Sequence, residues 1–147
     1  MLELRIKRLD AADNDIVLPH YATDHAAGMD LRVNCDIAIA PGEVLLAPTG
    51  IAVEIPEGYE GQVRPRSGLA AKHGITCLNS PGTIDADYRG ELKVILINHG
   101  KETVRFERGA RIAQLIISKY ERVEVIEAEE LAESVRATGG FGHTGVH

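Results

Sequence analysis

The stretch N-S-P-G-T-I-D-A-D-Y-R-G-E-L-K-V-I-L-I-N, residues Asn79–Asn98, is the part of the chain that decides the fold. It opens with a Pro-Gly turn, continues through Asp85, Asp87 and Tyr88, and ends in a strongly apolar run. Because successive strand residues face opposite sides, an extended backbone would place the two carboxylates on one face. The stretch predicts a polar turn between short extended arms. Such a turn can grip a small molecule with backbone groups, or it can be a hairpin with solvated acids at its tip.

Turn residues and short alternating runs fill the sequence before this stretch. The alternation of Leu2, Leu4 and Ile6 with charged residues predicts a first strand. Further strands are predicted at residues 28–33, 37–40, 43–47, 51–55 and 59–64, with turns at each Pro-Gly or Pro-x-Gly between them. Regularly spaced short strands are typical of an all-β sandwich or barrel. One short helix is predicted at Ser67–His73, with the serine as N-cap and Gly74 past its end.

Two apolar strands are predicted to be buried on both sides. Ile95–Ile97 does not alternate, and residues 111–118 show the same pattern. A single chain of this size covers both faces of such strands only with help, so part of this surface is expected to meet another subunit. A further strand is predicted at residues 120–126 and a weak helix at 127–134, before a glycine-rich tail.

Length, charge and cysteines bound the class of protein. The 147 residues predict one domain over 1–147, with a flexible glycine-rich C-terminal tail from about residue 135. A net charge of -6 does not suggest nonspecific nucleic-acid or anionic-membrane binding, so a polyanionic ligand would need local arginines. Cys35 and Cys77 have neither framework spacing nor zinc partners, which predicts a reducing, cytoplasmic setting. The N-terminus is unlike a signal peptide, and no apolar run is long enough to span a membrane.

Two polar sites stand out upstream of the central stretch. Arg66, Ser67 and Gly68 open the predicted helix, where free amides, a guanidinium and a hydroxyl suit an anion. The alternative is a plain N-cap beside an exposed arginine. Asp30 can present a carboxylate to a hydrated magnesium ion, or it can be a strand-end acid without a metal.

Two more polar sites lie downstream. Gln114 sits inside an apolar run, so its amide must either tie down a neighbouring loop or meet a ligand. Arg111 lies on the opposite face of a regular strand, although both can still flank one site near the strand's start. The tail offers Arg136 as a cation and Phe141 as a stacking surface. It is either a closing flap or a disordered terminus.

The order of five motifs is more specific than any one of them. A-G-M-D-L (27–31), P-R-S-G-L-A (65–70), G-T-I-D-A-D-Y-R-G (82–90), R-I-A-Q (111–114) and G-G-F-G-H-T-G (139–145) follow one another. This series closely resembles that of the homotrimeric dUTPases. The resemblance implies a distorted β jelly-roll barrel and a trimer with sites at subunit interfaces. It also implies magnesium-dependent hydrolysis of dUTP to dUMP and pyrophosphate, which keeps uracil out of DNA and supplies dUMP for dTMP synthesis.

The resemblance assigns a role to each matched residue. Asp85 would be the general base that activates the water attacking the α-phosphorus, and Tyr88 would lie under the deoxyribose. Uracil would be read by Asn79 and by the backbone from Gly82 to Tyr88, which includes Thr83 and Ile84. The phosphate chain would be held by Arg66, Ser67, Gly68 and Gln114, with Asp30 contacting Mg²⁺ through water. The closing flap would consist of Arg136, Phe141, Gly142, His143 and Thr144.

Two positions qualify this assignment. Arg111 matches the family, but its role can be structural, such as pairing with an acid. Ala137 stands where many relatives have a glycine directly after the arginine, which puts the docking of the flap in doubt but not the activity.

Two rival functions remain open. The dCTP deaminases resemble this chain in fold and in the arginine-serine helix start, but they carry a glutamate three residues before the asparagine, where this chain has Ile95. Without that carboxylate, deamination has no evident base. A noncatalytic jelly roll that binds nucleotide for regulation or assembly would need the tail but not Asp85.

Overall fold

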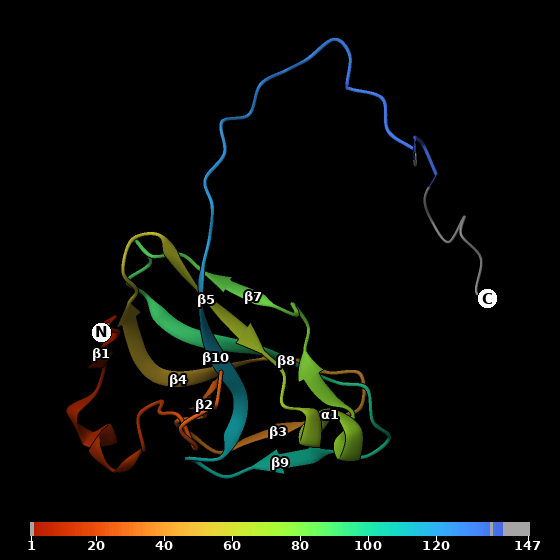
Figure 1. The fold of residues 1–147 in the computed structure, drawn as a ribbon. Coiled ribbons are helices and arrows are strands. Elements are labelled where there is room, and N and C mark those ends of the chain that lie inside the picture. Colours follow the sequence, from red (N-terminus) through yellow and green to blue (C-terminus); the bar gives the residue numbers. More distant parts are fainter. Residues whose placement is uncertain (1, 136, 140–147) are drawn as a thin grey trace.

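Two four-stranded antiparallel sheets form the body of the protein (Figure 1). The computed structural model describes residues 2–135 and 137–139. The strands within these residues are β1 (Arg5–Arg8), β2 (Met29–Arg32), β3 (Ile37–Ile39), β4 (Val44–Glu54), β5 (Tyr59–Arg64), β6 (Ile75–Cys77), β7 (Gly82–Ile84), β8 (Glu91–Asn98), β9 (Val104–Phe106) and β10 (Arg111–Lys119). The helices are α1 (Ser67–His73) and a short 3₁₀ helix at Ala11–Asp15.

The sheets have the orders β1-β4-β8-β6 and β2-β10-β5-β7, with β3 and β9 as a separate pair. Both four-stranded sheets contribute to one apolar core, in which Leu31 and Leu115 from one sheet lie with Val94 and Leu96 from the other. Two four-stranded sheets around one core are the arrangement of a jelly roll. The predicted all-β class is therefore confirmed, but the described strands do not close into a barrel.

Strand β8 shows how the apolar central stretch is used. Leu92, Val94 and Leu96 are fully buried, while the alternate residues face the other side of the sheet. On that outer side Ile95 pairs with Leu46 of β4, which is 55% exposed. Apolar residues therefore lie on both faces of β8, and the outer face stays partly open to solvent.

Strand β4 contains the first difference from the sequence prediction. The predicted turn at residues 48–50 is wrong, because β4 continues through it as one strand of 11 residues. Its pairing with β8 is interrupted between Pro48 and Ala52, and Gly50 has a positive φ of 70°. Proline has no amide to donate to the ladder, and glycine adopts this backbone conformation without strain. The two residues therefore make an irregularity inside a strand instead of ending it.

Helix α1 has the predicted bounds but a different N-cap residue. The amides of Leu69 and Ala70 donate to the carbonyl of Arg66, which makes Arg66 the N-cap and Ser67 the first helical residue. The predicted serine cap is wrong, and Arg66 makes no capping bond with its side chain. Gly74 ends the helix in the left-handed conformation, as predicted. No described helix is long and apolar enough to cross a membrane.

The chain leaves the body after β10 and runs outward as an extended arm (Figure 1). Neither the strand predicted at 120–126 nor the helix predicted at 127–134 is present. Val123 and Ile126 are 80% and 76% exposed, so the apolar residues that suggested a strand have nothing to pack against within this chain. A strand also needs a neighbour to satisfy its backbone groups, and the arm has none here.

Candidate active site

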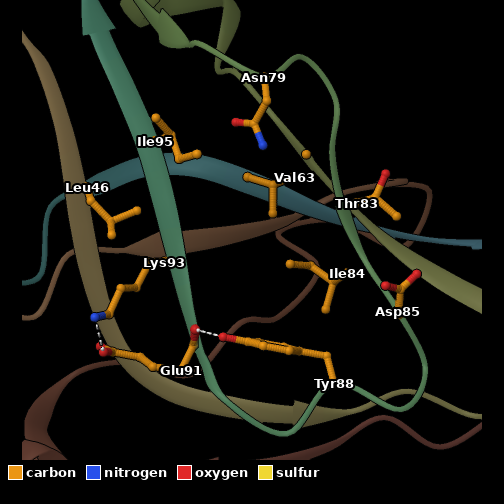
Figure 2. Close-up of a pocket in the computed structure, with 11 residues that line it drawn as sticks. Leu46, Val63, Asn79, Thr83, Ile84, Asp85, Tyr88, Glu91, Lys93 and Ile95 are labelled. Atoms are coloured by element: carbon orange, nitrogen blue, oxygen red, sulfur yellow. Dashed lines mark hydrogen bonds and ion pairs between the residues drawn. The ribbon is translucent and has the colours of Figure 1, made fainter.

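A pocket of about 280 Å³ lies between the 79–88 loop and the start of β8 (Figure 2). It is lined by Leu46, Val63, Asn79, Gly82, Thr83, Ile84, Asp85, Tyr88, Glu91, Lys93 and Ile95. Six residues that the sequence assigned to the base, the sugar and the attacking water are among them. The fold thus gathers the predicted nucleoside residues at one place.

The loop takes its shape from pairing of β7 with β5, followed by a tight turn. Gly82 and Ile84 pair with Val63 and Gly61, and the amide of Tyr88 then donates to the carbonyl of Asp85 at 3.1 Å. Asp85 and Asp87 are both exposed, as the alternation predicts, but the extended backbone ends at Ile84. Of the two carboxylates, Asp85 lines this pocket.

Tyr88 forms one wall of the pocket. Its hydroxyl donates to the carbonyl of Glu91 at 3.0 Å (Figure 2). A Cβ on Gly90 would lie 2.4 Å from that hydroxyl oxygen and 2.6 Å from the ring. Only glycine at position 90 therefore lets the ring lie against the turn.

The pocket is apolar along its sides and polar at its ends. Figure 2 shows the amide of Asn79 at one end and the carboxylate of Asp85 toward the other, with Val63 and Ile84 between them. A Cβ on Gly82 would lie 3.0 Å from Nδ2 of Asn79, so the missing side chain makes room for this amide. An apolar slot with a few placed polar groups suits a planar, uncharged, polar ring.

A second constellation is built around Asp30. One carboxylate oxygen is 3.1 Å from Nε of Arg66, and the other is 3.1 Å from Nη1 of Arg111. Arg66 also lies 3.4 Å from the carbonyl of Arg111. We call Asp30, Arg66, Arg111 and Gln114 the arginine cluster. Arg111 pairs with an acid, as the resemblance suggested, and two cations on one carboxylate leave the cluster with net positive charge.

Gln114 ties down the loop that leads to α1. Its Nε2 donates to the carbonyl of Pro65 at 2.9 Å, and a Cβ on Gly28 would lie 2.5 Å from its Oε1. Gln114 pairs with Asp30 across β2 and β10, which puts both side chains on one face. The prediction that Arg111 lies on the opposite face is wrong, because a register shift between Arg111 and Ala113 returns it to the Asp30 side.

The other predicted phosphate residues lie at the open start of α1. Ser67 and Gly68 are exposed, and no atom lies within 4 Å of a Cβ placed on Gly68. None of the arginine cluster lines the pocket. The predicted flap residues Arg136, Phe141, Gly142, His143 and Thr144 lie outside the described residues. Ala137 is described and has a positive φ of 43°, a conformation that favours glycine.

Sequence reasoning missed part of the pocket wall. Glu91 and Lys93 line it, and an ion pair of 3.3 Å joins them. Their spacing of two residues in a strand places them on one face, which was the available signal. Leu46 lies on a distant strand, and nothing local in the sequence assigns it to the pocket.

The shortest ion pairs among the described residues lie around Arg108. Its guanidinium is 2.7 Å from Asp13 and 2.5 Å from Asp15. Hydrogen bonds from Arg108 lower the pKa of both carboxyls below the ordinary range. These groups join the 3₁₀ helix to the end of β9 and take no part in lining the pocket.

Asp30 is the residue to test against a magnesium ion. The described residues contain no group of three His, Cys, Asp or Glu side chains placed to hold a metal. Mg²⁺ is commonly bound by one or two carboxylates together with substrate phosphates, and it keeps several waters. Both oxygens of Asp30 lie 3.1 Å from guanidinium nitrogens, so this carboxylate would reach such an ion through the ion's waters and not by direct coordination.

Fold and site together define a jelly roll with one pocket for a planar polar ring and a neighbouring cationic site for an anion, which is the class of nucleotide-binding proteins. The family model named dUTPase matches residues 14–145. The chain belongs to the dUTPase family.

Curated relatives agree over nearly the whole chain. A protein of Rickettsia bellii is 58% identical over 147 residues, covering 99% of this chain and 97% of the relative. One of Rickettsia canadensis is 63% identical over 131 residues, or 88% of each chain. Both are named deoxyuridine 5'-triphosphate nucleotidohydrolase, that is, dUTP diphosphatase, which confirms the predicted enzyme class.

Solved structures agree on the fold. The dUTPase of Staphylococcus bacteriophage 80alpha with dUPNHPP is 28% identical, with a TM-score of 0.89, and the match covers 98% of this chain and 99% of that one. A mutant dUTPase of phage phi11 of S. aureus, described as coordinating a structural Mg(II) ion, has a TM-score of 0.79 at 25% identity. It covers 87% of this chain and 97% of its own. The predicted jelly-roll fold is thereby confirmed.

Proposed function

We propose that this chain hydrolyses dUTP to dUMP and pyrophosphate, keeps uracil out of DNA and supplies dUMP for dTMP synthesis. One observation carries the proposal: in a member of the dUTPase family, the pocket for a planar ring has the free carboxylate of Asp85 on its lining. The residues around that carboxylate divide into groups that read the base, support the sugar and hold the phosphates.

The base would be read by the 79–88 loop. Asn79 and the backbone of Gly82 to Ile84 line one side of the pocket, and their donors and acceptors would pair with the edge of uracil. Cytosine reverses this pattern and would leave buried groups unpaired, which discriminates strongly. The closeness of the loop to Val63 leaves little room for the methyl group of thymine.

Asp85 would act as the general base. Its side chain makes no hydrogen bond or ion pair within residues 2–135 and 137–139, so both oxygens can accept from water. The ionised carboxylate would take a proton from a water that attacks the α-phosphorus in line, and pyrophosphate would leave on the far side. General bases contribute about 10²–10⁴-fold to rate. No covalent enzyme intermediate is required.

The phosphate chain would lie along the start of α1 and the arginine cluster. Arg66, Ser67 and Gly68 offer a guanidinium, a hydroxyl and an unobstructed backbone, and Gln114 holds the preceding loop in place. Asp30 would contact the waters of a magnesium ion, which when bound neutralises negative charge on the phosphates. The guanidinium of Arg66 would stabilise the charge that moves onto the departing pyrophosphate.

Two features support a homotrimer with sites shared between subunits. The arginine cluster does not line the pocket: Val63 faces the pocket, and the next residue, Arg64, faces the side of Gln114. In a trimer the pocket of one subunit would meet the arginine cluster of a second, and the flap would come from the third. The extended arm, with Val125 and Leu131 each 90% exposed, would reach a neighbouring subunit.

The cysteines support the cytoplasmic setting that the sequence predicts. Cys35 and Cys77 are both free, and Cys35 is exposed. Burial raises the pKa of the Cys77 thiol to about 11, which keeps it protonated and unreactive. Free thiols are typical of reducing compartments.

Product analysis across dUTP, dCTP, dTTP and UTP tests the proposal. With magnesium, the purified protein is expected to release pyrophosphate from dUTP and to leave the other three nearly untouched. Ammonia release from dCTP would show a deaminase instead, although Ile95 supplies no carboxylate to the pocket. Binding of dUTP without pyrophosphate release would show a noncatalytic binder.

A further inference from the structure

Glu91 joins the aromatic wall of the pocket to the irregular part of β4. Its carbonyl accepts the hydrogen bond from the Tyr88 hydroxyl at 3.0 Å. Its carboxylate accepts from the amide of Gly50 at 3.0 Å through Oε1, and Oε2 lies 3.3 Å from Nζ of Lys93. The Glu91 side chain is only 21% exposed, so these contacts are partly shielded from water.

The contact with Gly50 replaces a bond that the sheet cannot make. Pairing between β4 and β8 is interrupted between Pro48 and Ala52, which leaves the Gly50 amide without a ladder partner. The Glu91 carboxylate accepts from that amide, and the Thr49 hydroxyl donates to the carbonyl of the next residue of β8, Leu92. Two side chains therefore fasten the start of β8 where the backbone ladder fails.

Gly50 is itself held firmly from the opposite side. Its carbonyl accepts from the amide of Leu9 at 2.9 Å, and the carbonyl of Pro48 accepts from the amide of Asn34 at 3.0 Å. A Cβ on Gly50 would lie 2.8 Å from side-chain atoms of both Asn34 and Asp13, so these side chains lie close against the glycine. Glu91 is thus anchored to a fixed point.

The ring of Tyr88 depends on this anchor more than a core aromatic would. Tyr88 is 43% exposed and lies outside the buried core cluster. Its hydroxyl bond to Glu91 and its contact with Gly90 hold it in place. The Tyr88 ring would exclude a ribose by collision with its 2′-hydroxyl only if the ring cannot move away from the sugar.

We propose that Glu91 is a positioning residue that holds Tyr88 against the sugar and so sets the preference for deoxyribose over ribose nucleotides. This inference rests on the proposed function, because it assumes that the sugar lies on Tyr88. Glu91 acts through Tyr88 and need not touch the substrate.

Three variants separate this role from simple stabilisation. Glu91→Ala removes the bond to Gly50, and Glu91→Gln keeps an acceptor for that amide but loses the charge. Lys93→Met removes the ion pair and a cation of the pocket lining while keeping the bond to Gly50. The ratio of kcat/KM for dUTP to kcat/KM for UTP is measured for each. We expect this ratio to fall about tenfold in Glu91→Ala, in the range of a single pocket contact. It should stay within about threefold of the wild type in the other two variants, since they retain the bond to Gly50.

The control is the thermal midpoint, which shows whether each variant is folded. An equal loss of kcat/KM for both nucleotides in folded Glu91→Ala would overturn the inference, because a merely structural residue would behave so. An equally large fall of the dUTP-to-UTP ratio in Glu91→Gln would also overturn the inference, since that variant keeps an acceptor for the Gly50 amide.

Binding of dUMP and UMP by calorimetry gives a second readout that needs no turnover. Folded Glu91→Ala should lose most of the preference for dUMP, and an unchanged preference would contradict the inference. If the wild-type protein failed to hydrolyse dUTP, the proposed function would fail while this binding comparison still decided the role of Glu91.

Discussion

The 79–88 loop and the arginine cluster are both polar, but they are built in opposite ways. In the loop the chemical group, the carboxylate of Asp85, has no partner among the described side chains, and backbone pairing with β5 gives the pocket its shape. In the arginine cluster every group is already engaged: Asp30 binds Arg66 and Arg111, and Gln114 binds the carbonyl of Pro65. Under the proposed function, the nucleobase would therefore be read in a pocket shaped by backbone pairing, whereas the phosphates would meet charges that are already held in place.

The difference also concerns what each region can do alone. The pocket at the loop can hold a planar ring and has the unpaired carboxylate of Asp85 on its lining. Among the described residues, its one lining cation, Lys93, is paired with Glu91. The arginine cluster has cations and no slot. Substitutions in the loop should therefore change turnover and selectivity, while those in the cluster should change affinity for phosphates.

The largest effect is expected for Asp85→Asn. The amide cannot take a proton from water, so kcat should fall about 10²–10⁴-fold. Binding of a nonhydrolysable dUTP analogue, measured by calorimetry, should change little because the pocket keeps its shape. If turnover survived the change, Asp85 would not be the general base, and the loop would not differ from the arginine cluster by carrying the catalytic group.

An intermediate effect is expected for Arg66→Ala. Loss of a charged contact to the phosphates should lower kcat/KM for dUTP about ten- to a hundredfold. The affinity for dUMP should fall less, since fewer phosphate oxygens are lost. The matched control is Arg64→Ala: this neighbouring arginine bonds only to Gln62 among the described residues, so kcat/KM should stay close to the wild type. Equal losses in both variants would mean that overall charge, and not the cluster, matters.

The smallest effect is expected for Gly28→Ala. The new Cβ would lie 2.5 Å from Oε1 of Gln114 and push its amide off the carbonyl of Pro65. Losing one neutral hydrogen bond predicts a fall in kcat/KM of about three- to tenfold, with the fold retained. The double variant with Gln114→Leu should be no worse than Gln114→Leu alone, because the two changes act on one contact. Additive losses would place the effect of Gly28 elsewhere.

The sequence could predict the features that depend on residues close together in the chain. Local alternation found most strands of the body, and Gly74 marked the end of α1 as predicted. The residues of the loop were identified from their motif, and the pocket brings them together. All of these features are local in sequence.

Features that depend on distant pairing were missed. The irregularity at Pro48 and Gly50 and the register shift near Arg111 depend on which strands are neighbours. Periodicity alone read the first as a turn and put Arg111 on the wrong face. The predicted strand at 120–126 failed for a related reason, since its apolar residues have no partner strand within one chain.

The carboxylate between two guanidinium groups has a consequence for the empty enzyme. Arg66 and Arg111 would repel each other if nothing stood between them, and their side chains would swing apart into water. Asp30, with one oxygen on Nε of Arg66 and the other on Nη1 of Arg111, offsets this repulsion and holds both guanidinium groups near one another in the absence of a ligand. Under the proposed function, an arriving triphosphate would meet guanidinium groups whose side chains are already ordered, which lowers the entropic cost of binding.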